Sequence, residues 1–163
     1  MTDACGPESL AFAIRRDRRG SNLKLLAAQC RIKRDGGALT ASMVATLVER
    51  GYKPWVETDT TWERVGELLP KHHVFISWWT LFFPSGETVD GAGAHWSVVT
   101  RLGPVKVYLW DPTYEQVVAY PRATLDALWV TPERIGKVLH DEVRLAVVAP
   151  RRPLGRKKHQ NSS

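Results

Sequence analysis

The chain has 163 residues, a length that fits one domain with a sizeable hydrophobic core. Hydrophobic residues make up 44% and charged residues 25%, as in ordinary globular proteins, and no apolar run approaches the ~20 residues of a membrane span. The net charge of +6 comes largely from arginine and lysine clusters without interleaved aromatic residues, a pattern that favours a solvated surface over a nucleic-acid platform.

The two cysteines and the first residues of the chain indicate which class of protein this is. Cys5 and Cys30 are too few for a disulfide framework and lack the spacing of a zinc site. The first residues have neither the basic nor the apolar region of a signal peptide. We therefore expect a cytoplasmic protein, or a fragment of a larger one, with no metal or organic cofactor. No pattern in the sequence indicates an oligomeric state.

The N-terminal third is predicted to be helical. Residues 4–9 have the composition of a helix start, because proline is tolerated in the first turn and glutamate suits the positive end of the helix dipole. Apolar residues follow at helical spacing as far as Ile14. A second, short helix is expected over 23–27, and a third from a Thr40 cap to a stop at Gly51. Cys5 would then lie at the N-terminus of a buried helix.

The rest of the chain is predicted to be mainly strands. We expect strands over 53–57, 74–83, 95–102, 105–110, 115–120 and 142–149, with helices from Thr60 or Thr61 to about Leu69 and over 123–129. Helices followed by a mostly antiparallel sheet indicate an α+β fold. One domain is expected over 1–150, followed by a basic, disordered tail over 151–163.

Residues 84–94 hold three glycines and a proline and are predicted to form a long loop. It could flank a substrate cleft as a lid, or be only a connection.

Cys5 is the candidate nucleophile. A thiol attacks as thiolate, which the N-terminus of a helix and a nearby imidazolium both stabilise. His95 opens an apolar strand after a glycine-rich segment, so it is expected at the sheet edge, where it can face a helix end. The alternative for Cys5 is a small buried core residue, which is the role favoured for Cys30.

Asp111 is the candidate residue that orients the histidine. It ends the strand that follows a turn at Gly103-Pro104. Counting outward from that turn, Leu102 faces Val105, and Trp96 faces approximately Asp111. His95 and Asp111 are therefore predicted to be neighbours, as an orienting hydrogen bond requires. The alternatives are a strand histidine with satisfied hydrogen bonds and an aspartate that only starts a turn.

Other histidines and tryptophans carry weaker signals. His72 and His73 are expected in a loop before a strand, and no third ligand is spaced to make them a metal site. Alternation puts Trp78 and Trp79 on opposite faces of the sheet, so one of them could line the cleft. Trp96 is expected to point away from His95 and to pack in the core.

Three segments, 4–10, 94–99 and 107–112, resemble the signature segments of the peptidase C39-like domains, which are papain-like cysteine proteases. The resemblance spans the chain from Cys5 to about Pro150. It implies a papain-like fold, no cofactor, and a peptide or protein substrate. It also implies that Cys5, His95 and Asp111 are nucleophile, base and orienting residue. The family usually has a glutamine before the cysteine that helps hold the oxyanion, and residues 1–4 contain none.

Three functions remain open on this reading. The first is a papain-like protease with a Cys5–His95–Asp111 triad, acting on a leader peptide, a polyprotein or a host protein. The second is a C39-like module that binds a peptide without cutting it, which the missing glutamine favours. The third is a basic domain associated with nucleic acid, whose binding would fall steeply with salt.

Overall fold

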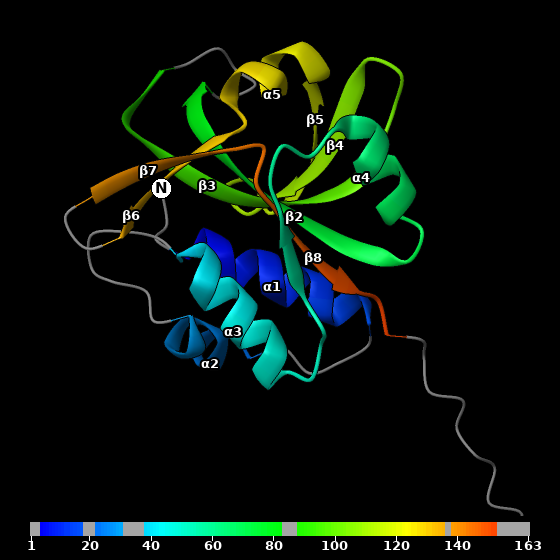
Figure 1. Cartoon of the computed structure of the whole chain (residues 1–163), viewed down its shortest axis with the longest axis vertical. Helices are drawn as coiled ribbons and strands as arrows, with labels where there is room; N and C mark the ends of the chain where they lie inside the picture. Colours follow the sequence, from blue (N-terminus) through cyan, green and yellow to red (C-terminus); the bar gives the residue numbers. More distant parts are fainter. Residues whose placement is uncertain (1–3, 18–21, 31–37, 83–87, 136–137, 153–163) are drawn as a thin grey trace, which may run out of the picture.

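The computed structural model describes residues 4–17, 22–30, 38–82, 88–135 and 138–152 (Figure 1). Its elements in chain order are α1 (Cys5–Arg16), α2 (Leu23–Gln29), α3 (Thr40–Glu49), β1 (Trp55–Glu57), α4 (Trp62–Leu68), β2 (His72–Phe82), β3 (Thr88–Leu102), β4 (Lys106–Asp111), β5 (Gln116–Pro121), α5 (Arg122–Leu128), β6 (Val130–Ile135), β7 (Val138–Val143) and β8 (Ala146–Pro150). Within these ranges, no helix combines the length and the apolar character that crossing a bilayer requires.

The strands form a six-stranded sheet in the order β1-β8-β2-β3-β4-β5, and β6 pairs with β7 in a separate two-stranded ribbon. Every pairing in the sheet is antiparallel. Helices α1, α2 and α3 lie on one side of the sheet, and α4 and α5 lie on the other (Figure 1). The prediction of an α+β fold, with N-terminal helices packed on an antiparallel sheet, is confirmed.

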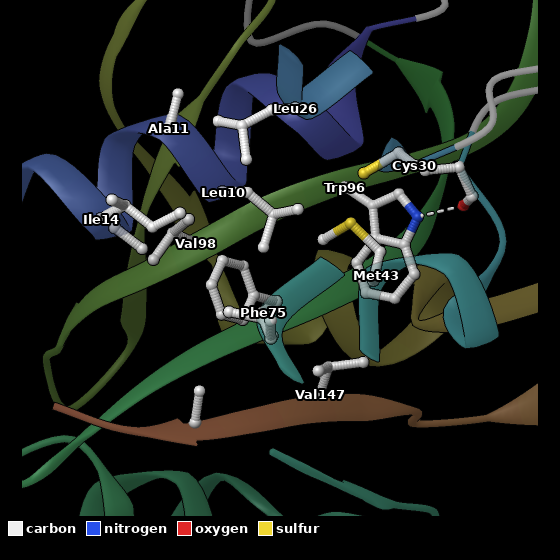
Figure 2. Packing of buried hydrophobic residues seen from close by; sticks show 14 of the residues in the cluster. Leu10, Ala11, Ile14, Leu26, Cys30, Met43, Phe75, Trp96, Val98 and Val147 are labelled. Carbon is white, nitrogen blue, oxygen red and sulfur yellow. Dashed lines mark hydrogen bonds between the residues drawn. The ribbon is translucent and has the colours of Figure 1, made fainter. Parts of the chain in front are cut away.

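The core on the first face joins the N-terminal helices to the sheet. Leu10 and Ile14 of α1 and Met43 of α3 point at Phe75 of β2 and at strand residues beside it (Figure 2). The indole of Trp96 on β3 lies in the same cluster, and its Nε1 donates to the carbonyl of Ala38 at 2.7 Å. Burying each large apolar side chain contributes about 1.5–3 kcal/mol, so this cluster holds α1 on the sheet.

A second core lies on the opposite face, because alternate residues of each strand point to opposite sides. Val74, Ile76 and Trp78 of β2 belong to it, whereas Phe75 belongs to the first core. Helix α4 contributes Trp62, whose ring lies 4.5 Å from that of Trp129. The sheet is therefore buried on both faces along its central strands.

The prediction of a loop over residues 84–94 is wrong for residues 88–94, which belong to β3. They pair with β2 in a long hairpin, with Trp79 opposite Ala94 and Thr80 opposite Gly93. Local composition favoured a loop, but the ladder hydrogen bonds to β2 outweigh weak strand propensity. The suggestion that a loop over residues 84–94 forms a lid is therefore incorrect for residues 88–94. Residues 84–87 lie outside the described residues.

Several boundaries also differ from the prediction. His72 and His73 lie inside β2, not in a loop before it. Helix α3 begins at Thr40, with Leu39 in the cap position and no side-chain capping bond. The single strand expected over 142–149 is interrupted at Arg144. The φ of this residue, 48°, lies in the left-handed region, which an extended strand cannot contain, so β7 ends before it. Sequence reasoning did not foresee β6.

A buried polar cluster anchors the C-terminal end of α1. Asp17 accepts hydrogen bonds on Oδ2 from His73 Nε2 at 2.9 Å and from the Tyr52 hydroxyl at 2.8 Å. The Arg152 amide approaches the same oxygen at 3.5 Å. Arg151 Nε donates to the His72 carbonyl at 3.1 Å. The first two residues of the predicted tail therefore contact the domain, and residues 153–163 lie outside the described part.

This cluster predicts a pH dependence of stability. Burial lowers the pKa of His73, Asp17 opposes that effect, and the Arg151 and Arg16 charges add to it. The unfolded state, with a histidine pKa of about 6.5, therefore binds more protons at this site below that pH, and the contribution of His73 to stability falls as the pH drops from 7 to 5. We expect His73→Gln, which keeps a donor but cannot ionise, to lose less stability than the parent over this range. Urea midpoints at both pH values measure this, and equal slopes in the two proteins would contradict it.

Candidate active site

Cys5 is the first residue of α1, and its side chain is only 4% exposed. Ala4 precedes it in the cap position, Pro7 occupies the first turn, and Glu8 is the acidic residue of that turn. The predicted helix start is therefore present. The amide groups at the start of a helix carry partial positive charge, and Cys5 lies at this end of α1.

The first turn of α1 docks on the backbone of β3. The Trp96 N–H donates to Cys5 Sγ at 3.5 Å, and the hydroxyl of Ser9 donates to the Trp96 carbonyl at 3.1 Å. Cys5 and Ser9 are four residues apart and so lie on one face of the helix. The β3–β4 ladder runs from Val98 paired with Trp110 to Leu102 paired with Val107, so Trp96 lies just beyond it. Helix α1 therefore supplies hydrogen-bond partners for the backbone N–H and C=O of Trp96, at the point where β3 is no longer paired with β4.

His95 and Asp111 form a buried pair on the other side of β3. His95 Nε2 donates to Asp111 Oδ1 at 2.8 Å, and each residue is 2% exposed. The predicted proximity is present, but the register differs from the prediction: Leu102 faces Val107, not Val105. The turn is longer than expected, and an irregularity between Val99 and Arg101 shifts the later pairs.

Asp111 is held by two further donors. The Thr113 amide donates to Oδ1 at 2.9 Å, and the Tyr120 hydroxyl donates to Oδ2 at 2.6 Å. Burial opposes ionisation of Asp111, but the bonds from His95, Tyr120 and Thr113 hold the pKa of the carboxyl below its usual value. Asp111 is therefore a carboxylate at neutral pH, and it can hold a positive charge on the imidazole.

The second ring nitrogen of His95, Nδ1, is buried and has no hydrogen-bond partner of ordinary geometry among the described residues. Burial lowers the pKa of His95, but the hydrogen bond to Asp111 and the interaction with the Cys5 thiol outweigh it and raise that pKa to about 9. The imidazole is therefore positively charged at neutral pH, beside a sulfur at a helix N-terminus.

Aromatic side chains pack against this pair. The Trp78 ring meets that of His95 edge-on at a centroid distance of 5.6 Å and that of Tyr120 at 5.1 Å. Trp78 was a candidate for lining the cleft, and it instead packs on the histidine. Trp96 packs in the first core, as predicted. Tyr120 had no sequence signal, because its bond to Asp111 depends on how β5 lies against β4.

Cys30 has no part in this arrangement. It is fully buried at the end of α2, and its sulfur lies 3.4 Å from the Thr46 hydroxyl. Burial raises the pKa of the Cys30 thiol, and the bond to Thr46 only partly offsets that effect. The structure agrees with the structural role predicted for it. In the described ranges, no three His, Cys, Asp or Glu side chains gather in a group that could hold a metal ion.

Gly6 sets how closely Cys5 and the first turn of α1 approach the sheet. A Cβ at this position would lie 2.5 Å from the Ala38 Cβ and 3.0 Å from the Met43 sulfur. We expect Gly6→Ala to cost about 1–3 kcal/mol of unfolding free energy, because the first turn of α1 must move away from these atoms.

The matched control is Gly66→Ala in α4, where a Cβ would lie 3.6 Å from Leu102 Cδ1, an ordinary contact. Removing a helical glycine there should stabilise the protein by roughly 0.5–1 kcal/mol. Urea denaturation measures both variants. Equal effects of the two substitutions would show that the start of α1 is not tightly packed.

Two solved structures have the same fold. One is the peptidase domain of Streptococcus ComA, a bifunctional ABC transporter involved in a quorum-sensing pathway, with a TM-score of 0.65 and 14% identity over 92% of this chain and 93% of that chain. The other is a double glycine motif protease from an AMS/PCAT transporter, in complex with the leader peptide. Its TM-score is 0.62, with 15% identity over 92% of this chain and 86% of that chain. No protein-family model and no curated protein sequence matches the chain. The predicted resemblance to C39-like peptidase domains is confirmed for the fold.

Proposed function

We propose that this chain, which has the papain-like fold of the C39-like peptidase domains, is a cysteine hydrolase that cleaves a peptide bond. Cys5 is the nucleophile, His95 the general base and acid, and Asp111 the residue that orients the imidazole. The observation that carries the proposal is the buried His95–Asp111 pair at 2.8 Å, with a raised histidine pKa of about 9, beside a cysteine at a helix N-terminus. A strand histidine with only a structural role would have no reason to keep its second ring nitrogen, Nδ1, without a hydrogen-bond partner beside a thiol.

The reaction follows from these positions. The Cys5 thiolate attacks the substrate carbonyl carbon, and the carbonyl oxygen takes the negative charge. The His95 imidazolium gives its proton to the amide nitrogen of the leaving group, and the C–N bond breaks to leave a thioester on Cys5. His95 then takes a proton from water, the resulting hydroxide attacks the thioester, and the acid product leaves as the thiolate reforms. Asp111 stays ionised throughout and holds the ring.

The start of α1 can supply the oxyanion donors. Pro7 has no N–H, and the Glu8 amide donates to the Ala4 carbonyl at 2.9 Å. The donors that this turn can offer are therefore the amides of Cys5 and Gly6. Loss of a single oxyanion donor typically lowers the rate about 10²–10³-fold. An enzyme that relied on these two amides alone would therefore be slower than one with an additional side-chain donor, but still active.

The substrate that the solved neighbours suggest is a leader peptide. One of them is a double glycine motif protease bound to such a peptide, and we extend that substrate class to this chain. A peptide module that binds without cutting is the second candidate.

The first test is chemical and needs no substrate. In a Cys30→Ser parent, we expect iodoacetamide to alkylate Cys5 at pH 6.5 at least ~10-fold faster than it alkylates glutathione, because a free thiol with a pKa of about 8.5 is only ~1% ionised there. His95→Ala should lower the rate roughly 10–100-fold. Identical rates with and without His95 would show that no thiolate–imidazolium pair exists.

The second test is cleavage of a synthetic leader peptide that ends in Gly-Gly before a short cargo sequence. We expect mass spectrometry to find a single cut after the second glycine, no cut with Cys5→Ala, and a rate lower by roughly 10²–10⁴-fold with Asp111→Asn, because the imidazole loses its orientation. Cys30→Ser serves as the control and should cut at the parent rate. Tight binding of the peptide without any cut would identify the chain as a binding module.

A further inference from the structure

The Asp111 carboxylate has an additional donor that the triad does not require. The Tyr120 hydroxyl on β5 lies 2.6 Å from Oδ2, a distance typical of a hydrogen bond strengthened by a negative charge. Tyr120 is 5% exposed. Its burial, followed by the charge of Asp111, raises the pKa of its hydroxyl. The hydroxyl therefore keeps its proton, and remains a donor, through the pH range in which the protein functions.

Trp78 covers this chain of hydrogen bonds. Its ring meets both His95 and Tyr120 edge-on, and its Nε1 donates to the Ser97 hydroxyl at 3.1 Å, which fixes the indole. The bonds from Tyr120 to Asp111 and from His95 to Asp111 therefore lie in dry surroundings. Hydrogen bonds are stronger there, and an unpaired partner is more costly.

We infer that Tyr120 is a positioning residue: its hydroxyl holds Oδ2 of Asp111 so that Oδ1 stays on His95 Nε2 and the imidazole stays directed at Cys5. A carboxylate can turn about its Cβ–Cγ bond. Thr113 and His95 both bond to Oδ1, whereas Tyr120 bonds to Oδ2. Without Tyr120, Oδ2 would be a buried, unpaired charge, and the carboxylate would turn to find another donor. The inference rests on the proposed function, because it assigns the role through the same triad.

The groups that can titrate in this region are few. His95 is faced by Cys5 from α1 and by Asp111 from β4. Tyr120 is faced by Asp111 and by Tyr114, which follows β4. Among these titratable groups, Asp111 is the one that bonds to both His95 and Tyr120, so we expect a change at Tyr120 to reach the titration of His95 through it.

The main test is Tyr120→Phe in the Cys30→Ser parent. We expect Cys5 alkylation at pH 6.5 to slow about 10-fold, and the His95 imidazole signal in NMR to titrate below the parent value of about 9, towards 6.5. Tyr108→Phe is the matched control. Tyr108 lies on β4 with the Arg101 guanidinium 3.8 Å from its ring centroid, away from the triad, and its loss of a hydroxyl should leave both measurements unchanged.

The outcomes separate this inference from the proposed function. If Cys5 is activated in the parent and Tyr120→Phe leaves the rate and the His95 titration unchanged, or moves the titration upward, the positioning role is wrong while the hydrolase stands. If Cys5 is not activated in the parent, the proposed function fails, and the NMR titration alone still decides whether Tyr120 controls His95. Adding Tyr120→Phe to His95→Ala should produce no further loss of reactivity.

A second measurement leaves Tyr120 in place, in case the variant folds poorly. With ¹³C-labelled tyrosine, the Cζ signal of Tyr120 should move with the same midpoint as the His95 titration, because the two residues share one carboxylate. In His95→Ala, that movement should disappear. A Tyr120 signal that ignores the His95 titration would overturn the inference without any substitution at Tyr120.

Discussion

The docking of the first turn of α1 on the backbone of β3 determines the rest of the site. At Trp96, β3 has passed the last pair of its ladder with β4, and a buried N–H and C=O there must find partners. Cys5 and Ser9 provide them, at 3.5 Å and 3.1 Å. Because His95 is the residue before Trp96, the contact that satisfies the strand also brings the sulfur to the histidine.

The two faces of the sheet contribute different parts of this arrangement. Cys5 belongs to the first core, with Trp96, whereas Trp78 belongs to the second and packs on His95. A buried imidazolium and a buried carboxylate are each costly to remove from water, and they are stable only as a pair with their remaining hydrogen bonds satisfied. Tyr120 and Thr113 satisfy those of Asp111. The polar pair is therefore enclosed by the aromatic residues of the second core.

Helix α1 is held at both ends, about 18 Å apart for its 12 residues. Cys5 and Ser9 fix its start on β3, and Asp17 fixes its end through His73 of β2 and Tyr52. A helix fixed in this way cannot slide along the sheet without breaking a buried polar contact. The position of Cys5 relative to His95 therefore depends on residues far from the site, including those that contact Asp17.

The sequence by itself determined the fold class, the helix that starts at Cys5, and the three residues that meet, because these depend on local signals: proline and glutamate in a first turn, strand alternation, and one hairpin between His95 and Asp111. Tertiary structure decided what local signals do not carry. Pairing with β2 turned residues 88–94 into strand, and the irregularity near Val99 shifted the register. The roles of Ser9, Trp78 and Tyr120 arise from contacts between elements distant in the chain, and those contacts form only when both faces of the sheet are covered.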